Sequence, residues 1–155
     1  MTVAARDDRP LDVLTSPGYL LMKAGHYIGL EFEAVLAGLE LNAREFLVLS
    51  FARTSDDLSQ QDLSTRLAVD PTIVVGLIDA LEDRGLITRT KDPADRRRNV
   101  LSLTPAGAEL HNAAVAEATT AQDAFFAQLP AGEREQFRTT LRTILTPRLP
   151  WLNDR

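Results

Sequence analysis

The 155-residue sequence contains no cysteine and only two histidines. The absence of thiols excludes disulfide bonds, thiolate metal sites and peroxide sensing through cysteine, and it fits the cytoplasmic location that we expect. A dedicated zinc sensor is not expected either, because two histidines without cysteine are a poor ligand set for structural zinc.

Long apolar runs and catalytic motifs are also missing. No run of about 18 apolar residues is present, which argues against a membrane span. The first ten residues are polar and charged, unlike a secretory signal. Acidic pairs occur at Glu31/Glu33 and Asp56/Asp57, but no phosphate-binding loop, zinc-protease motif or nucleophile elbow accompanies them. We therefore expect no membrane partner, no cofactor and no enzymatic activity.

The N-terminal part predicts a flexible arm over residues 1–12 and then a long helix. Ser16 and Pro17 supply an N-cap and a first-turn proline, and the helix should run to about Ala37 and end at Gly38. Its apolar residues occupy more than one stripe. A helix with one side exposed to solvent would have a single apolar stripe and a polar opposite face. Burial against a second copy of the chain is therefore the simplest explanation for the additional apolar residues.

Three shorter helices follow in close succession. Capping-box patterns at 42–45 and 59–62 predict helices that end near Arg53 and Leu67. After a three-residue break, Asp70 and Pro71 start the next helix, and Gly85 ends it. The buried side of that helix should carry residues spaced i, i+3, i+4 and i+7: Val74, Leu77, Ile78 and Leu81. Two helices joined this closely predict a helix-turn-helix, whose second helix enters the major groove of DNA.

A charged ribbon comes directly after this motif. Residues 86–90 and 100–104 predict paired strands around a polar tip. Six basic and two acidic residues give segment 84–98 a charge of +4, whereas 11 basic and 20 acidic residues leave the rest of the chain at -9. DNA responds to the local field, because salt screens charges beyond about 8–10 Å. The ribbon therefore suits DNA contact, and the overall acidity predicts weak non-specific binding.

The ribbon tip predicts individual roles for its charges. Residues two apart face the same way on an extended segment, so Asp95 should hold the guanidinium of Arg97. A braced arginine loses less entropy when it enters a narrow minor groove. Arg96, Arg98 and Lys91 are then expected at phosphates. A solvated hairpin tip is the alternative for such a run, but the preceding helix-turn-helix favours DNA contact.

The exposed face of the second helix offers few groups for hydrogen bonds to base edges. We expect four residues there to face the bases, mainly through thymine methyl groups: Thr72, Ile73, Val75 and Gly76. Ser59 and Gln60 should lie near the DNA backbone, at a helix N-terminus. Gly76 costs about 1 kcal/mol of helix stability relative to alanine. Close approach to DNA or close packing between helices would explain it.

The C-terminal part predicts two more helices. Thr104 and Pro105 cap a long alanine-rich helix to about Leu129, and a last helix should span 133–145. The segment 149–152, which holds the only tryptophan, is expected to dock against the protein and not to continue the helix.

Segment 58–107 resembles the winged helix-turn-helix of the MarR family (multiple antibiotic resistance regulators). Three stretches carry the resemblance, which extends over most of the chain from about Pro17: Leu81-Glu-Asp-Arg-Gly-Leu86, Asp92-Pro-Ala-Asp-Arg-Arg97 and Ser102-Leu-Thr-Pro-Ala-Gly107. The resemblance implies a mainly α-helical fold with a small β-hairpin wing. It also implies a homodimer, usually a repressor, which an anionic or phenolic ligand releases from double-stranded DNA. By position, Arg97 would be the minor-groove arginine and Asp95 its brace.

On this basis we divide the chain into an arm (1–12), a helical dimerisation region (13–40 and 105–155) and a DNA-binding lobe (41–104). Two lobes should bind a pseudo-palindromic operator with half-sites about 10 bp apart. The alternative function is a winged helix that binds a protein partner and has no specific DNA site. A steep loss of DNA affinity with salt would separate the two.

The resemblance also implies an effector site between the first two helices and the lobe. Tyr19, Met22 and His26 share one face of the first helix, and Phe46 is the candidate from the second helix. An imidazole could meet a carboxylate or phenol of an aromatic effector. A histidine in the dimer interface and a phenylalanine in the ordinary core are the alternatives. The sequence predicts that His111, on the long helix, lies at the surface.

Overall fold

The computed structural model describes residues 12–93, 95 and 97–154. The predicted arm, apart from Asp12, and Arg96 lie outside these residues. The described chain forms six α-helices, two short 3-10 helices and one two-stranded antiparallel ribbon, which confirms the predicted fold class. Within the described residues, no helix is long and apolar enough to cross a membrane.

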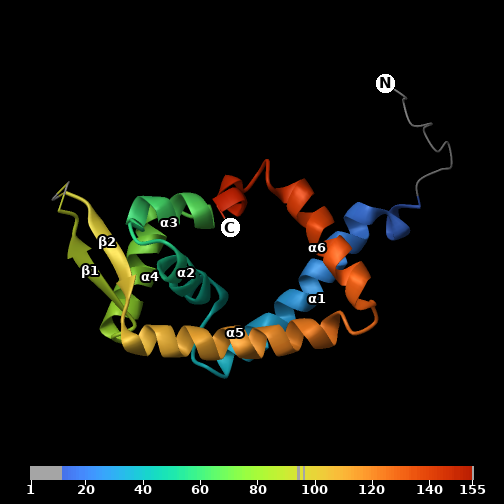
Figure 1. Cartoon of the computed structure of the whole chain (residues 1–155), viewed down its shortest axis with the longest axis horizontal. Coiled ribbons are helices and arrows are strands. Elements are labelled where there is room, and N and C mark those ends of the chain that lie inside the picture. Colours follow the sequence, from blue (N-terminus) through green and yellow to red (C-terminus); the bar gives the residue numbers. More distant parts are fainter. Residues whose placement is uncertain (1–11, 94, 96, 155) are drawn as a thin grey trace.

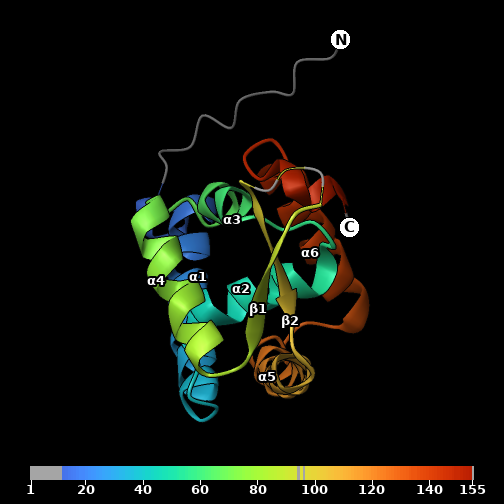
Figure 2. The same ribbon diagram turned by 90° about the vertical axis from the view of Figure 1, so that its left-hand side faces the viewer.

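The DNA-binding lobe predicted for residues 41–104 is built from five elements. Helices α2 (Ala43–Thr54), α3 (Gln60–Leu67) and α4 (Pro71–Asp83) precede strands β1 (Ile87–Lys91) and β2 (Asn99–Leu103). The strands pair from Ile87 opposite Leu103 to Lys91 opposite Asn99, and we call this ribbon with its tip the wing. Each strand is shifted by one residue from its predicted bounds. Figure 2 shows α3, α4 and the wing side by side, with α5 end-on at the foot of the wing.

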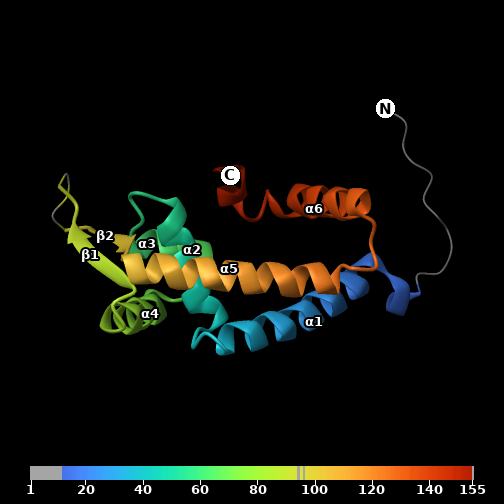
Figure 3. The ribbon, with the colours of Figure 1, turned by 60° about the horizontal axis from the view of Figure 1, so that its bottom comes forward.

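Three long helices extend from this lobe. α5 (Pro105–Phe125) leaves the wing, and α1 (Pro17–Ala37) lies alongside it (Figures 1 and 3). α6 (Ala131–Leu145) then turns back, so that the C-terminus lies beside the lobe in Figure 1. A short 3-10 helix, η1 (Val13–Thr15), precedes α1, and another, η2 (Pro150–Asp154), follows α6.

The helix starts follow the local capping chemistry. The Asn42 side chain accepts from the Glu45 backbone N–H, and the Glu45 carboxylate accepts from the Asn42 backbone N–H. The same reciprocal pair joins Ser59 and Asp62. These boxes satisfy N–H groups that a helix leaves without partners in its first turn.

The predicted end of the long helix is wrong by four residues. α5 ends at Phe125 and not near Leu129, because the chain makes two tight turns through Phe126 before Pro130. A proline disfavours helical geometry at the residue before it, here Leu129, so the helix does not continue through this segment. The Phe126 ring packs on the Phe137 ring of α6 at 5.8 Å, which turns the chain back.

The hydrophobic core lies in the lobe, around α2. Its fully buried side chains come from α1, α2, α3, α4 and both strands: Leu36, Val48, Leu49, Leu63, Ile78, Leu81, Ile87 and Leu101. The tail docks on this lobe as predicted, because the Trp151 ring meets the Phe51 ring edge-on at 5.3 Å. η2 therefore connects the C-terminal helices to the core.

Gly107 marks a close approach between the first turn of α5 and the segment that enters β1. A Cβ at this position would lie 1.9 Å from the Leu86 carbonyl oxygen. The Thr104 hydroxyl donates to the Gly85 carbonyl at 2.6 Å and accepts from the Gly107 N–H at 3.0 Å. Only glycine fits here, because the opposing atoms are backbone and cannot rotate away.

We expect Gly107→Ala to lower the free energy of unfolding by about 3 kcal/mol, since a clash with backbone cannot be relieved locally. Thermal unfolding followed by circular dichroism should show a melting temperature lower by about 10 °C. Gly76→Ala is the matched control, because a Cβ there meets no atom within 4 Å. Equal stability of the two variants would contradict this account of Gly107.

Candidate nucleic-acid interface

The turn between α3 and α4 begins with a left-handed residue. Ala68 ends α3 with φ 52° and ψ 45°, a conformation that costs a non-glycine residue about 1–2 kcal/mol. Ser64 holds the turn, since its hydroxyl donates to the Val69 carbonyl at 2.8 Å and its own carbonyl accepts from the Val69 N–H at 3.2 Å. This bracing fixes the angle of α4, and the sequence analysis had not singled out Ser64.

Asp70 caps the start of α4. Its carboxylate accepts from the Thr72 backbone N–H at 2.8 Å, and this bond holds the pKa of Asp70 below its usual value. α4 then presents the predicted face, with Ile73 and Val75 each 42% exposed and Thr72 and Gly76 also exposed. The opposite side of α4 is buried in the core. The helix can therefore offer a small apolar surface to an external partner.

A hollow of about 490 Å³ lies between α3, α4 and the wing. Nine residues line it: Ser59, Gln60, Gln61, Pro71, Val75, Asp95, Arg97, Arg98 and Asn99. The structure thus brings together residues that the sequence analysis had assigned separately to a helix N-terminus, a recognition helix and a wing. It adds Gln61, Pro71 and Asn99, of which Gln61 was recognisable as the neighbour of Gln60 in the same first turn.

Asp95 and Arg97 interact differently from the sequence expectation. The Asp95 carboxylate accepts from the Arg97 backbone N–H at 2.9 Å, in place of the guanidinium. Asp95 therefore fixes the shape of the tip. Among the described residues, the Arg97 guanidinium has no ion-pair partner, and it lines the hollow as a cation.

Ser59 and Arg98 are already engaged within the chain. Ser59 is 7% exposed, and both its hydroxyl and its N–H donate to the Asp62 carboxylate. Arg98 donates to the carboxylates of Asp62 and Asp92. Partial burial raises the pKa of Asp62, but the bonds from Ser59 and Arg98 outweigh it and hold that pKa below its usual value.

A further arginine ties the wing to α4. Arg89 of β1 forms ion pairs with Asp79 and, at 3.3 Å, with Glu82. Arg89 thereby neutralises two carboxylates in the C-terminal half of α4. The N-terminal half of the same helix lines the hollow. Lys91, at the end of the same strand, is exposed. Arg96 lies outside the described residues.

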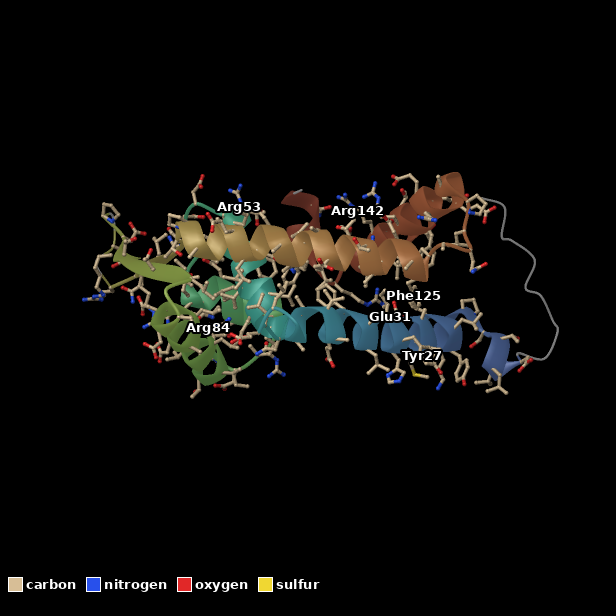
Figure 4. All side chains as sticks on the ribbon, turned by 90° about the horizontal axis from the view of Figure 1, so that it is seen from below. Tyr27, Glu31, Arg53, Arg84, Phe125 and Arg142 are labelled. Carbon is tan, nitrogen blue, oxygen red and sulfur yellow. The ribbon has the colours of Figure 1, made fainter. Side chains whose placement is uncertain are left out.

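The four predicted effector residues are not brought together. A cavity of about 240 Å³ lies between α1, α2 and α5, and it is lined by Ile28, Phe32, Phe46, Val115, Ala118, Thr119, Ala121 and Gln122. Phe46 is the single predicted residue in this lining. Met22 is 61% exposed, and His26 is exposed with its ring edge-on to that of Tyr27. Figure 4 shows Tyr27 on the side of α1 away from α5. Tyr19 is half-buried and has Lys23 over its ring.

The prediction that His111 lies at the surface is wrong. His111 is 9% exposed, its ring stacks on Phe46 at 5.6 Å, and its Nε2 lies 3.2 Å from the Ser50 hydroxyl. Gly107, His111 and Ala114 are the buried residues of α5. Their spacing of four and three residues was the available signal for this inner face.

Comparisons with known proteins agree with this geometry. A model of the MarR family matches residues 41–98. The HTH-type transcriptional repressor NicR of Pseudomonas putida is 31% identical over 142 residues, which cover 92% of this chain and 90% of that protein. Within the described part of the chain, no cluster of three or more His, Asp or Glu residues could hold a metal ion.

Two proteins of known structure are similar to this chain to the same degree. CouR from Rhodococcus jostii RHA1, bound to p-coumaroyl-CoA, is 31% identical with a TM-score of 0.76, covering 87% of this chain and 95% of that chain. CouR has also been solved on a 23-mer DNA duplex. Bordetella bronchiseptica BpsR, whose DNA binding is regulated by 6-hydroxynicotinic acid, is 30% identical with a TM-score of 0.75, covering 87% and 96%.

Gly76 gives a direct test of this surface. Because a Cβ there meets no atom of the described residues within 4 Å, close packing between helices of one chain does not explain the glycine. We expect Gly76→Ala to stabilise the fold by about 0.5–1 kcal/mol and to weaken binding to DNA, if α4 approaches DNA closely. Thermal unfolding and fluorescence anisotropy measure the two effects.

Gly132→Ala, in open space on α6, is the control that should leave DNA affinity unchanged. DNA binding by Gly76→Ala as tight as that of the wild type would show that the helix keeps its distance from the bases.

Proposed function

Because the chain belongs to the MarR family of DNA-binding transcriptional regulators, we propose that it is a homodimeric repressor released from a pseudo-palindromic operator by a small aromatic ligand. The family is one of regulators and not of enzymes. The observation that carries the proposal is the hollow between α3, α4 and the wing, into which Arg97 brings a cation without an ion-pair partner among the described residues.

The docking that we propose uses each part of this surface. Thr72, Ile73, Val75 and Gly76 of α4 face the bases in the major groove, and thymine methyl groups suit their apolar character. Gln60, at the N-terminus of α3 with Ser59 as its cap, lies against the DNA backbone. Arg97 enters the adjacent minor groove, held through the Asp95 bond to its backbone. Lys91 and Arg96 meet phosphates.

A second copy of the chain is the proposed partner of residues 13–40 and 105–155, and residues 41–104 form the proposed DNA-binding lobe. Large apolar side chains are exposed on η1, α1 and α6: Val13, Leu14, Leu20, Leu21, Met22, Tyr27, Leu30, Ile144 and Leu145. Single chains rarely expose so much apolar surface on neighbouring elements. A two-fold dimer would bury it and place two lobes on successive half-sites. We assign Tyr19, Met22 and His26 to that interface.

The cavity next to Phe46 is the proposed effector site. Its lining is mainly apolar and aromatic, with the Thr119 hydroxyl and the Gln122 amide as polar groups. A single aromatic ring with a hydroxyl substituent fits this character, since the ring can stack on Phe46. The ligands named for CouR and BpsR support the aromatic class.

Arg97→Ala tests the proposed binding mode. We expect affinity for the DNA upstream of its own gene to fall about 10- to 100-fold, the effect of losing one specific contact. Fluorescence anisotropy with random DNA as competitor gives the affinity. Circular dichroism and a sedimentation mass of twice 17.1 kDa should be unchanged.

Operator affinity unaltered by Arg97→Ala would remove Arg97 from the proposed mode. Wild-type protein that binds this DNA no more tightly than random DNA would leave a distant operator or a winged helix that serves a protein partner.

The effector proposal predicts reciprocal effects of ligand and DNA. 6-Hydroxynicotinic acid, or another hydroxylated aromatic acid from a panel, should raise the melting temperature of the protein and lower its affinity for operator DNA. Operator DNA should lower the affinity for the ligand by the same factor. Phe46→Leu should reduce both responses, while an aliphatic acid of equal charge should produce neither. Equal responses in Phe46→Leu would place the ligand elsewhere.

A further inference from the structure

The Arg98 side chain joins three separate segments of the lobe. Its Nη1 donates to Asp92 Oδ2 at 3.3 Å, at the end of β1. Its Nη2 donates to Asp62 Oδ2 at 3.2 Å, in the first turn of α3. The same nitrogen donates to the Asp57 backbone carbonyl at 2.5 Å, in the loop between α2 and α3. One guanidinium therefore connects the wing to the start of α3.

The groups that receive these bonds are themselves fixed. Asp62 is held by the hydroxyl and the N–H of Ser59 in the capping box. Asp92 donates its backbone N–H to the Arg98 carbonyl at 3.1 Å, and the Arg98 N–H donates to the Asp95 carbonyl at 2.9 Å. These two backbone bonds hold Asp92, Asp95 and Arg98 at fixed positions relative to one another, so the Arg98 side chain extends from an ordered backbone.

Strand β2 is itself attached to the segment that starts α3, through Leu101 in its middle and Val100 nearer the tip. The Leu101 N–H donates to the Leu58 carbonyl at 2.8 Å, and Ser59 pairs with Val100. A ribbon held only along this line of main chain could still tilt about it. Arg98 supplies the second attachment nearer the tip, and two attachments define an angle between the wing and α3.

The neighbouring arginines Arg97 and Arg98 differ in their ion-pair partners. Asp57, Asp62 and Asp92 would repel DNA phosphates beside the hollow, and Arg98 pairs with all three. A forked guanidinium can bind two carboxylates at once, which an ammonium group cannot do with the same geometry. Arg97, one residue away, has no such partner among the described residues and faces the hollow.

We propose that Arg98 is a positioning residue, which fixes the angle of the wing on α3 through Asp62 and Asp92 and so directs Arg97 to the minor groove. This inference rests on the proposed DNA-binding function and assigns Arg98 a role other than phosphate contact. Its consequence is that Arg98 contributes to operator recognition only through Arg97.

A double-mutant cycle tests this dependence. Affinities for operator and for random DNA are measured by anisotropy for Arg97→Ala, Arg98→Ala and the double variant. Arg98→Ala should weaken operator binding about tenfold, the size expected for the loss of two modest ion pairs, and should weaken random-DNA binding much less. In the Arg97→Ala background, removal of Arg98 should cause no further loss.

The matched control is Lys91→Ala, which removes the same unit charge from the same end of the wing. As an exposed phosphate contact it should weaken operator and random DNA alike, lower the salt slope by about 0.9, and add to Arg97→Ala. Arg98→Lys keeps the charge but loses the fork, so it should resemble Arg98→Ala.

Asp92→Asn gives a readout of opposite sign. Removal of a negative charge near phosphates would by itself tighten DNA binding, whereas loss of an Arg98 partner should weaken operator binding. Melting curves establish whether each variant is folded. If Arg98→Ala does not fold, Asp92→Asn alone tests the proposal.

Equal losses on both DNAs that add to Arg97→Ala, or full rescue by Arg98→Lys, would overturn the proposal and return Arg98 to a phosphate. Unchanged operator affinity in Arg98→Ala would overturn it as well. Failure of the wild type to prefer operator over random DNA, or of Arg97→Ala to reduce that preference, would instead reject the proposed function on which it rests.

Discussion

The carboxylate of Asp62 accepts hydrogen bonds from the Ser59 hydroxyl, the Ser59 backbone N–H and the Arg98 guanidinium. α3 has only eight residues, too few to be stable alone, so its first turn depends on this cap. The wing depends on the same carboxylate through Arg98. Because the pKa of Asp62 is lowered in the folded chain, its contribution to stability is present above the unfolded pKa and is lost as the pH falls through the folded value. The interface therefore keeps this support throughout the neutral range.

The lobe is attached to the long helices in a way that can transmit a change. α5 starts directly after the wing, where Thr104 bonds to the Gly85 carbonyl and Gly107 lies against Leu86. The same helix carries Val115 and Thr119 to the cavity beside Phe46. An effector bound in this cavity, as proposed, would contact the same helix that adjoins the wing. Under the proposed function, a ligand acts by favouring a lobe spacing that DNA does not accept.

Local chemistry predicted much of this structure, and tertiary packing decided the rest. The Asn42 box and the Gly85 stop were readable because caps act within a few residues. The surface position expected for His111 was wrong because the inner face of α5 is set by α2, which is distant in sequence. The alternation of side chains along a strand predicted a contact between the Asp95 carboxylate and the Arg97 guanidinium. The tip is a turn, however, and there the carboxylate accepts from the Arg97 backbone N–H, as aspartates in turns commonly do. The distant partners of Arg98, Asp62 on α3 and Asp57 in the loop before it, lie 36 and 41 residues away, beyond any local pattern.

The distribution of charge explains how an acidic chain can bind DNA with few cations. Arg89 is committed to Asp79 and Glu82, and Arg98 to the carboxylates beside the wing. Both arginines pair with carboxylates of the chain, Arg89 with two on α4 and Arg98 with those beside the hollow, and in the proposed binding mode neither contacts a phosphate. Fewer phosphate contacts mean a shallower dependence on salt and weak binding to arbitrary sequences. Under the proposed function, recognition then rests on methyl groups in the major groove, which α4 contacts, and on the width of the minor groove, which Arg97 senses. A binder of this kind gains selectivity because its non-specific affinity is low, and the net charge of -5 becomes part of that selectivity.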